Sequence, residues 1–171
     1  YDQLFVKPPG CHVPTPWHQD ITFWPVDVES RALCSIWITF DSVKRESSGL
    51  EFVRGSGHWP NRYKAVTPTY DPYMMDSDFE DPPDIDAHRD EYDRYGPDMS
   101  RGDCLIFDAH ILHGSSSNYS TEKPRRAFST RWAGEGVRFD PRRATMPLLW
   151  RHGLVSGDEI GGSLFPRVLP E

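Results

Sequence analysis

The stretch Trp17-His18-Gln19-Asp20 is the point from which the rest of the chain is interpreted. Side chains of an extended strand alternate with a period of two, which would place His18 and Asp20 on the same face. One imidazole and one carboxylate are two of the three ligands in a 2-His-1-carboxylate triad, which binds Fe(II) and leaves the opposite coordination positions open. A His-x-Asp pair is a weak signal by itself, so the prediction depends on a second histidine from elsewhere in the chain.

The run from Cys104 to Gly114 offers two candidates for that histidine. If the run is one strand, a largely apolar inward face is formed by Leu105, Phe107, Ala109, Ile111 and His113. His113 ends this face and is the first choice. His110 shares the parity of Asp108 and is the second choice, because a single β-bulge would exchange the two histidines.

Residues 32–40 form the clearest predicted strand. One face carries Cys34, Ile36, Ile38 and Phe40, and the other carries Ser35, Trp37 and Thr39. Alternation predicts burial of the first set and leaves open whether the second set faces water or lines a polar cavity. Further short strands are expected at residues 4–7, 50–53 and 124–132, which gives six or seven strands in all.

Three further residues are candidates for the site. Lys7, at the end of the first strand, is either an anion contact in a cavity or a solvated lysine. Arg125 shares a strand face with small residues, which leaves room for a planar carboxylate to be held by two parallel hydrogen bonds. Trp24 lies at even spacing from His18 and Asp20, so it is either an aromatic beside the site or a core residue.

Composition limits the class of protein. A net charge of −7 and a pI near 5.5 oppose a general nucleic-acid role and favour small-molecule partners. Three scattered cysteines without Cys-x-x-Cys spacing favour a reducing, cytoplasmic setting, and no apolar run is long enough for a membrane span. The chain starts at Tyr1 without a methionine, so an N-terminal portion is expected to be absent. The oligomeric state cannot be derived from these features.

Residues 66–98 are expected to form an acidic, lid-like insert. Eleven of the 26 acidic residues lie between Asp71 and Asp98, and such a stretch is expected to bury little and to stay outside the core. Its aromatic residues favour a lid over a disordered loop. Asp84, Asp86 and His88 repeat a metal-like pattern, although a solvated acidic face is the simpler interpretation. Residues 133–171 are expected to form a tail packed on the core.

Five segments in this order resemble the phytanoyl-CoA dioxygenase family. They are Trp-His-Gln-Asp, Ser-Ile-Trp-Ile-Thr-Phe-Asp, Ser-Gly-Leu-Glu-Phe-Val-x-Gly-Ser-x-His, Gly-Asp-x-Leu-Ile-Phe-Asp, and Leu-His-Gly-Ser-x-x-Asn followed by Arg-Arg-Ala. Members of this family are Fe(II)- and 2-oxoglutarate-dependent oxygenases. The resemblance implies a mainly all-β single domain over residues 1–171, a double-stranded β-helix or jelly roll of the cupin-like kind. It also implies loss of the family's N-terminal helical part, and a cavity lined by the face that bears Trp37.

The resemblance also implies roles for individual residues. His18, Asp20 and His113 would bind Fe(II), and Arg125 rather than Arg126 would hold the distal carboxylate of 2-oxoglutarate. The remaining implied contacts are Ser115 and Lys7 for the co-substrate and Gln19, Trp24 and Trp37 for the substrate. The implied reaction consumes O₂, releases succinate and CO₂, and hydroxylates a small or medium-sized metabolite.

Other functions fit parts of the same pattern. A carboxylate at Asp20 occupies the position that related halogenases leave for a halide, so hydroxylation is expected, although desaturation, epimerisation and ring closure use the same ligands. A catalytically silent β-sandwich that binds metal or ligand, and a cupin-like metalloenzyme that does not use 2-oxoglutarate, are the two alternatives. The acidic insert favours a cationic or hydroxylated substrate over an acyl-CoA, whose phosphates it would repel.

Overall fold

The computed structural model describes residues 2–148 and 151–169 of the chain. In chain order the elements are β1 (Asp2–Lys7), β2 (Thr15–His18), α1 (Asp20–Phe23), β3 (Leu33–Thr39), β4 (Leu50–Val53), α2 (Pro72–Met75), β5 (Arg94–Tyr95), β6 (Cys104–Asp108), β7 (His113–Ser115) and β8 (Arg125–Ala133). Short 3-10 helices cover Ser56–His58 and Arg89–Glu91. The described part has more strands than predicted, because β5 and β7 are too short to show a pattern in the sequence.

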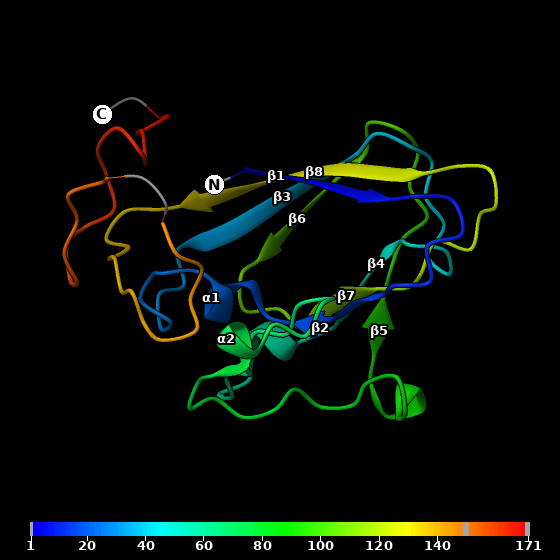
Figure 1. The fold of residues 1–171 in the computed structure, drawn as a ribbon, viewed down its shortest axis with the longest axis horizontal. Helices are drawn as coiled ribbons and strands as arrows, with labels where there is room; N and C mark the ends of the chain where they lie inside the picture. The colour runs from blue at the N-terminus through cyan, green and yellow to red at the C-terminus, as the bar shows by residue number, and fades with distance from the viewer. Residues whose placement is uncertain (1, 149–150, 170–171) are drawn as a thin grey trace.

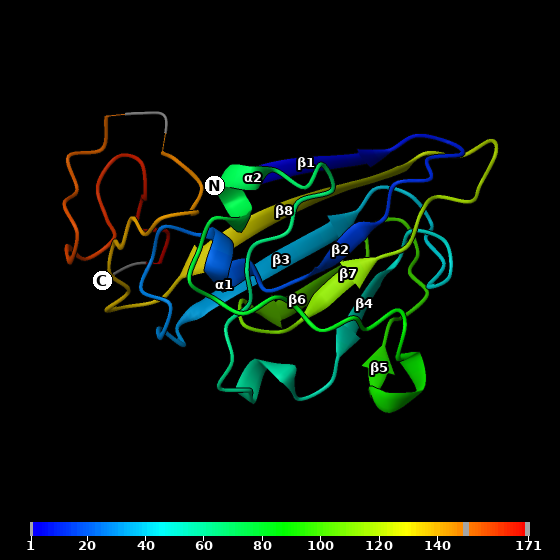
Figure 2. The ribbon, with the colours of Figure 1, turned by 60° about the horizontal axis from the view of Figure 1, so that its bottom comes forward.

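The strands form two antiparallel sheets that face each other (Figure 1). The first sheet has the order β1-β8-β3-β6, and the second has the order β2-β7-β4-β5. Figure 2 shows strands β2, β7 and β4 of the second sheet lying side by side. A buried cluster joins both sheets, since it contains Trp37 and Ala127 from the first and Leu50 and Phe52 from the second. The predicted double-stranded β-helix is confirmed.

The inward face of β3 is the opposite of the one predicted from alternation. Ser35, Trp37 and Thr39 are buried, whereas Cys34 and its alternate neighbours on β3 are only half-buried on the outer face. The second sheet packs over the face of β3 that carries Ser35, Trp37 and Thr39. Alternation identifies two faces but not which one another sheet covers, so the prediction was wrong.

The run from Cys104 to Gly114 is two strands and not one. β6 pairs with β3 in the first sheet, and β7 pairs with β2 and β4 in the second. The chain crosses between the sheets over residues 109–112, so counting parity from Leu105 to His113 has no structural basis. His113 nevertheless points inward, because it begins β7 on the side that faces the first sheet.

The acidic insert buries more than its composition predicted. Ile85 is fully buried and packs in a cluster with Trp17 and Leu112, and residues 94–95 extend the second sheet as β5. Charge neutralisation makes this packing favourable, because Arg89 and Arg94 both bind the buried carboxylate of Glu51, at 2.8 and 3.1 Å. The statement that this segment lies outside the core was wrong, while its role as a lid stays a prediction.

The segment after β8 lies against the α1 region at one end of the sandwich (Figure 1). Val137 is buried in a cluster with Ile21 and Trp24, and Phe139 forms a bridge with Val26. Arg143 forms an ion pair with Asp76 at the end of α2. No helix in the described residues is both long and apolar enough to cross a membrane.

Candidate metal centre

Three potential metal ligands meet between the two sheets. The ligand atoms of His18, Asp20 and His113 all lie within 4.8 Å of one another. The Oδ1 atom of Asp20 is 3.6 Å from Nε2 of His18 and 3.9 Å from Nε2 of His113. Two ligand atoms that are each about 2.1 Å from one ion lie at most about 4.2 Å apart, so both separations are compatible with a shared ion. Among the described residues, this is the one such group of histidine, cysteine and acidic side chains.

The segment that carries His18 and Asp20 is not extended throughout. β2 ends at His18, and α1 begins at Asp20 after Gln19 in an extended conformation. The helical backbone from Asp20 onward removes Trp24 from the parity count. Gln19, the residue between the two ligands, is extended, so His18 and Asp20 lie on the same side, as their spacing predicted.

Gln19 fixes this junction. Its side chain is fully buried, and its Nε2 atom donates to the His110 carbonyl at 3.0 Å. Its Oε1 atom accepts from the Tyr63 amide at 3.2 Å. Backbone groups therefore occupy both ends of the Gln19 amide, whereas the sequence analysis expected this side chain to contact substrate.

The hydrogen bonds of the three ligands prepare them for a metal. The Nδ1 atom of His18 lies 2.8 Å from the Pro16 carbonyl, and that of His113 lies 3.0 Å from the Ile111 carbonyl. A carbonyl oxygen only accepts, so each Nδ1 carries the proton and each Nε2 keeps its lone pair for a metal. The Ser35 hydroxyl donates to Oδ2 of Asp20 at 2.5 Å, which leaves Oδ1 directed at the two imidazoles.

The electrostatic environment favours the same protonation states. Burial would raise the pKa of Asp20, but its neighbours His18, His113 and Arg131 hold that pKa well below its usual range. Burial, followed by the charge of His18, lowers the pKa of His113 to about 4. At neutral pH the site therefore presents a carboxylate and a neutral imidazole, the forms in which these side chains bind metals.

Packing fixes the ring of His113, and His110, the second candidate for the ligand, lies elsewhere. The rings of Phe107 and Phe52 lie with their centroids 4.8 and 5.8 Å from that of His113. A Cβ on Gly114 would lie 3.0 Å from the Thr15 carbonyl, so a glycine after the ligand allows β2 to approach β7. The buried ring of His110 instead binds Asp108 and the Val28 carbonyl, at 2.9 and 3.0 Å, away from the triad.

Lys7 and Arg125 form a buried cationic pocket. They are paired opposite each other on the neighbouring strands β1 and β8 of the first sheet. Both side chains are buried, and the Lys7 ammonium donates to the hydroxyl of Ser115 at 2.9 Å and to the Ser116 carbonyl at 2.7 Å. The Nε atom of Arg125 is buried without a hydrogen-bond partner in the described residues, and Trp37 lies 5.7 Å from its guanidinium. Two adjacent cations are thus held beside one hydroxyl.

Burial weakens both positive charges of this pocket. Burial, followed by repulsion from Arg125, lowers the pKa of Lys7 to about 7. Burial lowers the pKa of Arg125 to about 10, so the guanidinium stays charged at neutral pH. Buried cations without an acidic partner are unfavourable, so the pocket is suited to an anion.

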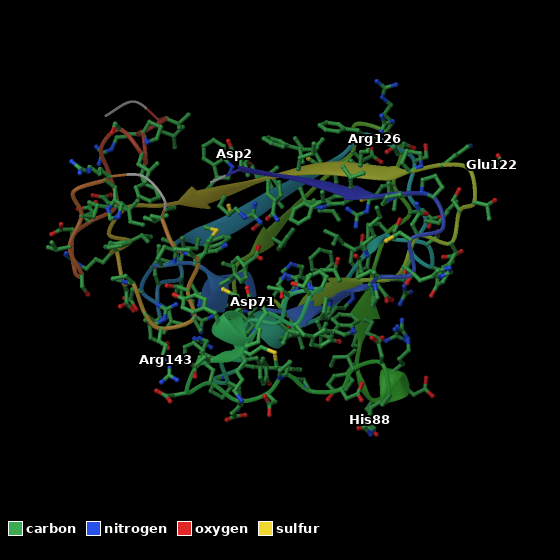
Figure 3. The ribbon with its side chains drawn as sticks, in the orientation of Figure 1. Asp2, Asp71, His88, Glu122, Arg126 and Arg143 are labelled. Carbon is green, nitrogen blue, oxygen red and sulfur yellow. The ribbon has the colours of Figure 1, made fainter. Side chains whose placement is uncertain are left out.

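Arg126, the alternative to Arg125, points the other way. Figure 3 shows its side chain leaving the outer face of the first sheet. Half of that side chain is exposed, and it forms an ion pair with Asp41 at 2.6 Å.

The other two aromatic candidates occupy different places. Trp37 is buried on the inner face of β3, between the sheets and next to Arg125. Trp24 directly follows α1 and packs among Ile21, Val26 and Leu33.

Ser35 is a residue whose position at the metal centre was not predicted. Its parity with Trp37 placed it on a face that could line a cavity, and this was the available signal. The contact with Asp20 depends on how α1 lies against β3, which the local pattern does not encode.

The model of the phytanoyl-CoA dioxygenase (PhyH) family matches residues 1–127. The chain therefore belongs to this family. No curated protein matches the chain.

Solved structures with the same fold include two proteins of nogalamycin biosynthesis. The non-heme alpha ketoglutarate dependent carbocyclase SnoK has a TM-score of 0.70 and 22% identity, over 96% of this chain and 59% of SnoK. The epimerase SnoN, in complex with Fe3+, alpha ketoglutarate and nogalamycin RO, has a TM-score of 0.69 and 20% identity, over 96% of this chain and 62% of SnoN. EvdO2 from Micromonospora carbonacea var. aurantiaca, complexed with 2-oxoglutarate, has a TM-score of 0.55 and 22% identity, over 84% of this chain and 55% of EvdO2. The chain thus spans less than two thirds of each.

Proposed function

We propose that the protein is an Fe(II)- and 2-oxoglutarate-dependent oxygenase that hydroxylates a small or medium-sized metabolite. Membership of the phytanoyl-CoA dioxygenase family supports the reaction class. The observation that carries the proposal is the buried Lys7–Arg125 pair, two cations without an acidic partner among the described residues. Lys7 contacts Ser115, on the same strand as the metal ligand His113. A metal site alone would not require such a pocket, whereas a dicarboxylate co-substrate would.

The metal centre fits Fe(II) through the chemistry of its donors. Two imidazoles with free Nε2 atoms and one carboxylate form the 2-His-1-carboxylate set of non-heme iron oxygenases. When bound, Fe(II) and 2-oxoglutarate supply the activation of O₂, with succinate and CO₂ as products of the co-substrate. His18, Asp20 and His113 would hold the metal, and Ser35 would keep Oδ1 of Asp20 turned towards it.

The cationic pocket fits the distal carboxylate of 2-oxoglutarate. Ser115 and His113 share one face of β7, since they are two residues apart, and this separates them by about 7 Å along the strand. A five-carbon dicarboxylate can bridge such a spacing, with one end at the metal and the other at Lys7, Ser115 and Arg125. These three residues would orient the co-substrate and neutralise its charge without transferring a proton.

Hydroxylation is the reaction proposed within this class. Asp20 fills the third protein ligand position, so a halide has no vacant protein site to occupy. SnoN and SnoK are described as an epimerase and a carbocyclase, which are oxidative outcomes that start from the same kind of centre. Product analysis separates these outcomes, because hydroxylation adds an oxygen atom to the substrate while epimerisation and ring closure do not.

A metal- or ligand-binding module without catalytic activity is the second candidate. It would use the same metal ligands and the same cationic pocket, which would hold a metal and an anion without turnover. A cupin-like metalloenzyme without 2-oxoglutarate is less well supported, because it leaves the Lys7–Arg125 pair unexplained.

Succinate release from 2-oxoglutarate distinguishes the oxygenase from the module. The Fe(II)-loaded protein is incubated in air with a metabolite mixture, alongside His113→Ala and the outer-face control Arg126→Met. We expect succinate from the wild type and from Arg126→Met, and loss of succinate in His113→Ala. A wild type that binds both Fe(II) and 2-oxoglutarate but forms no succinate would support the binding module instead.

A further inference from the structure

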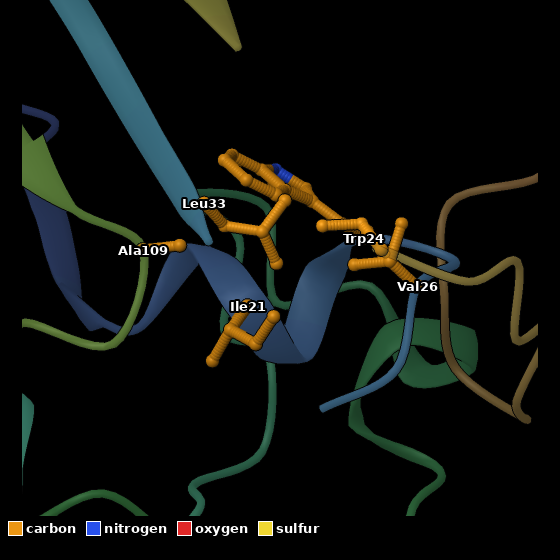
Figure 4. Close-up of a cluster of buried hydrophobic side chains, with 6 residues drawn as sticks. Ile21, Trp24, Val26, Leu33 and Ala109 are labelled. Atoms are coloured by element: carbon orange, nitrogen blue, oxygen red, sulfur yellow. The ribbon is translucent and has the colours of Figure 1, made fainter. Parts of the chain in front are cut away.

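The helix that begins with the metal ligand Asp20 depends on contacts from elsewhere in the chain. α1 has four residues, and a helix of this length leaves most of its carbonyls without a partner inside the helix. Its first three residues are buried, so those carbonyls need partners from the protein. Figure 4 shows α1 with Ile21, Trp24 and Val26 in one buried cluster. Whatever holds this segment also determines where the Asp20 carboxylate lies.

One arginine of the C-terminal segment supplies three hydrogen bonds to this region. The guanidinium of Arg142 donates to the carbonyls of Trp24 and Ile21, at 3.1 and 3.3 Å. It also donates to the Val26 carbonyl. The same guanidinium binds Oδ2 of Asp140 at 2.8 Å, which fixes its plane. Because Ile21 directly follows the metal ligand, Arg142 reaches the backbone one residue away from that ligand.

The backbone of the same segment binds two of the carbonyls in between. The Met146 amide donates to the Phe23 carbonyl at 2.9 Å, and the Asp140 amide donates to the Pro25 carbonyl at 3.0 Å. Five of the six carbonyls of residues 21–26 thus accept a hydrogen bond from the C-terminal segment, the three bound by the arginine and these two. The C-terminal segment therefore caps the far end of α1.

The start of α1 is held by other parts of the chain. The Ile21 amide donates to the Ala109 carbonyl at 2.9 Å, and the Ser35 hydroxyl donates to Oδ2 of Asp20. These contacts come from β3 and from the crossing between the sheets. Asp20 lies at this end of α1, so a shift of the far end would turn its carboxylate about the contact with Ser35.

The burial of Arg142 has a cost that its carbonyl contacts offset. Its side chain is only 18% exposed, and its Nε atom is buried without a hydrogen-bond partner among the described residues. Leaving a buried donor unpaired is unfavourable. The neighbouring Arg143 differs, because its side chain is 64% exposed and pairs with Asp76. Both arginines lie beyond the residues that match the family model.

We propose that Arg142 is a positioning residue for the metal centre, which holds α1 so that the Asp20 carboxylate meets the two histidine ligands. This inference rests on the proposed function and adds to it a residue that acts through the backbone of α1. Without the guanidinium, the carbonyls after Asp20 lose their donors and the far end of α1 is released. His18 and His113 belong to β2 and β7, so the carboxylate is the ligand that this release displaces.

Titration of Co(II) into the metal-free protein tests the proposal, because the visible absorption of Co(II) reports its ligands. We expect Arg142→Gln to weaken Co(II) binding by about tenfold or more, the usual effect of losing a group that orients a ligand. Its Co(II) spectrum should shift towards that of Asp20→Ala. The matched control Arg143→Gln removes the exposed neighbour and should bind Co(II) as the wild type does. Wild-type affinity and spectrum in Arg142→Gln would overturn the assignment.

A double-mutant cycle separates positioning from a general loss of stability. In Asp20→Ala the two histidine ligands remain, and adding Arg142→Gln should have no further effect on Co(II) affinity. Equal losses in both backgrounds would mean that Arg142 supports the fold as a whole, and would refute the proposal. If Arg142→Gln does not fold, Arg142→Lys takes its place in the same cycle with the same criteria, since lysine keeps the charge but not the planar guanidinium.

Co(II) binding requires neither 2-oxoglutarate nor turnover, so this inference and the proposed function can fail separately. The absorption band that forms when 2-oxoglutarate chelates Fe(II) is recorded on the anaerobic wild type. A band in the wild type together with unchanged Co(II) binding in Arg142→Gln refutes the positioning role alone. Weakened Co(II) binding in Arg142→Gln without any band in the wild type refutes the proposed function and leaves Arg142 as a residue that holds the metal site.

Discussion

Replacing Arg125 with methionine should stabilise the fold while impairing co-substrate binding. Burial lowers the pKa of Arg125 from 12.5 to about 10, and each unit corresponds to about 1.4 kcal/mol. Keeping this guanidinium charged at pH 7 therefore costs the folded protein about 3 kcal/mol. Methionine retains apolar contact with Trp37 but loses a cation–π contact of about 1 kcal/mol. The net expectation is an increase of about 2 kcal/mol in the free energy of unfolding without co-substrate.

The pH dependence of this effect has a definite sign. A cation whose pKa is lower in the folded state is destabilising at every pH below that folded value, and the cost disappears as the pH rises towards the unfolded value. The gain from Arg125→Met should therefore be complete at pH 7 and should shrink above about pH 10. Urea denaturation of the metal-free protein at several pH values measures this change in the free energy of unfolding.

The same substitution should weaken 2-oxoglutarate binding by at least about a hundredfold, because two charge-assisted hydrogen bonds are lost. Arg126→Met is the matched control, since it removes a neighbouring arginine from the outer face. It should change stability by at most about 1 kcal/mol, the usual range for an exposed ion pair, and leave co-substrate affinity unchanged. If Arg125→Met destabilises the protein and binds 2-oxoglutarate as the wild type does, the proposed pocket is wrong.

Three further perturbations probe other parts of the account. Ser35→Ala should weaken metal binding by about ten- to a hundredfold, since Asp20 loses the donor that orients it, and unchanged affinity in a competition titration would contradict this. The dissociation constant of 2-oxoglutarate should rise by up to about tenfold per pH unit above pH 7. Lys7 has a pKa of about 7 in the free protein, so above pH 7 it must take up a proton when a carboxylate binds beside it. A Lys7→Met variant should lack this pH dependence. Glu51→Gln should lower the free energy of unfolding by about 3 kcal/mol above pH 4.5, because Arg45, Arg89 and Arg94 lose their buried carboxylate. A change below about 0.5 kcal/mol in urea denaturation would exclude that role.

Local patterns in the sequence identified most of the strands but not how the sheets face each other. The alternation in residues 32–40 is real, yet Trp37 and its neighbours face inward while Ile36 and Ile38 face outward. Which face is buried depends on the second sheet, whose strands come from distant parts of the chain. Ile85 was missed for a similar reason, because its acidic surroundings are neutralised by contacts that sequence composition does not reveal.

The members of the candidate site were named from the sequence, but strand parity described only how His18 and Asp20 pair, and not how His113 joins them. His18 and Asp20 lie on the same side of the extended Gln19, whereas His113 belongs to a separate strand that follows a crossing between the sheets. The order of motifs pointed to three residues that the structure brings together, because that order reflects the whole fold. The amide of Gln19 joins two backbone segments, and in sequence such a residue looks the same as a polar residue that faces a cavity.

Anaerobic titration of 2-oxoglutarate into the Fe(II)-loaded protein tests the central claim most directly. The account predicts a metal-to-ligand absorption band that saturates at one co-substrate per iron, is absent in His113→Ala, and requires far more 2-oxoglutarate in Arg125→Met than in Arg126→Met. Stoichiometric iron binding without any such band at saturating 2-oxoglutarate would contradict it.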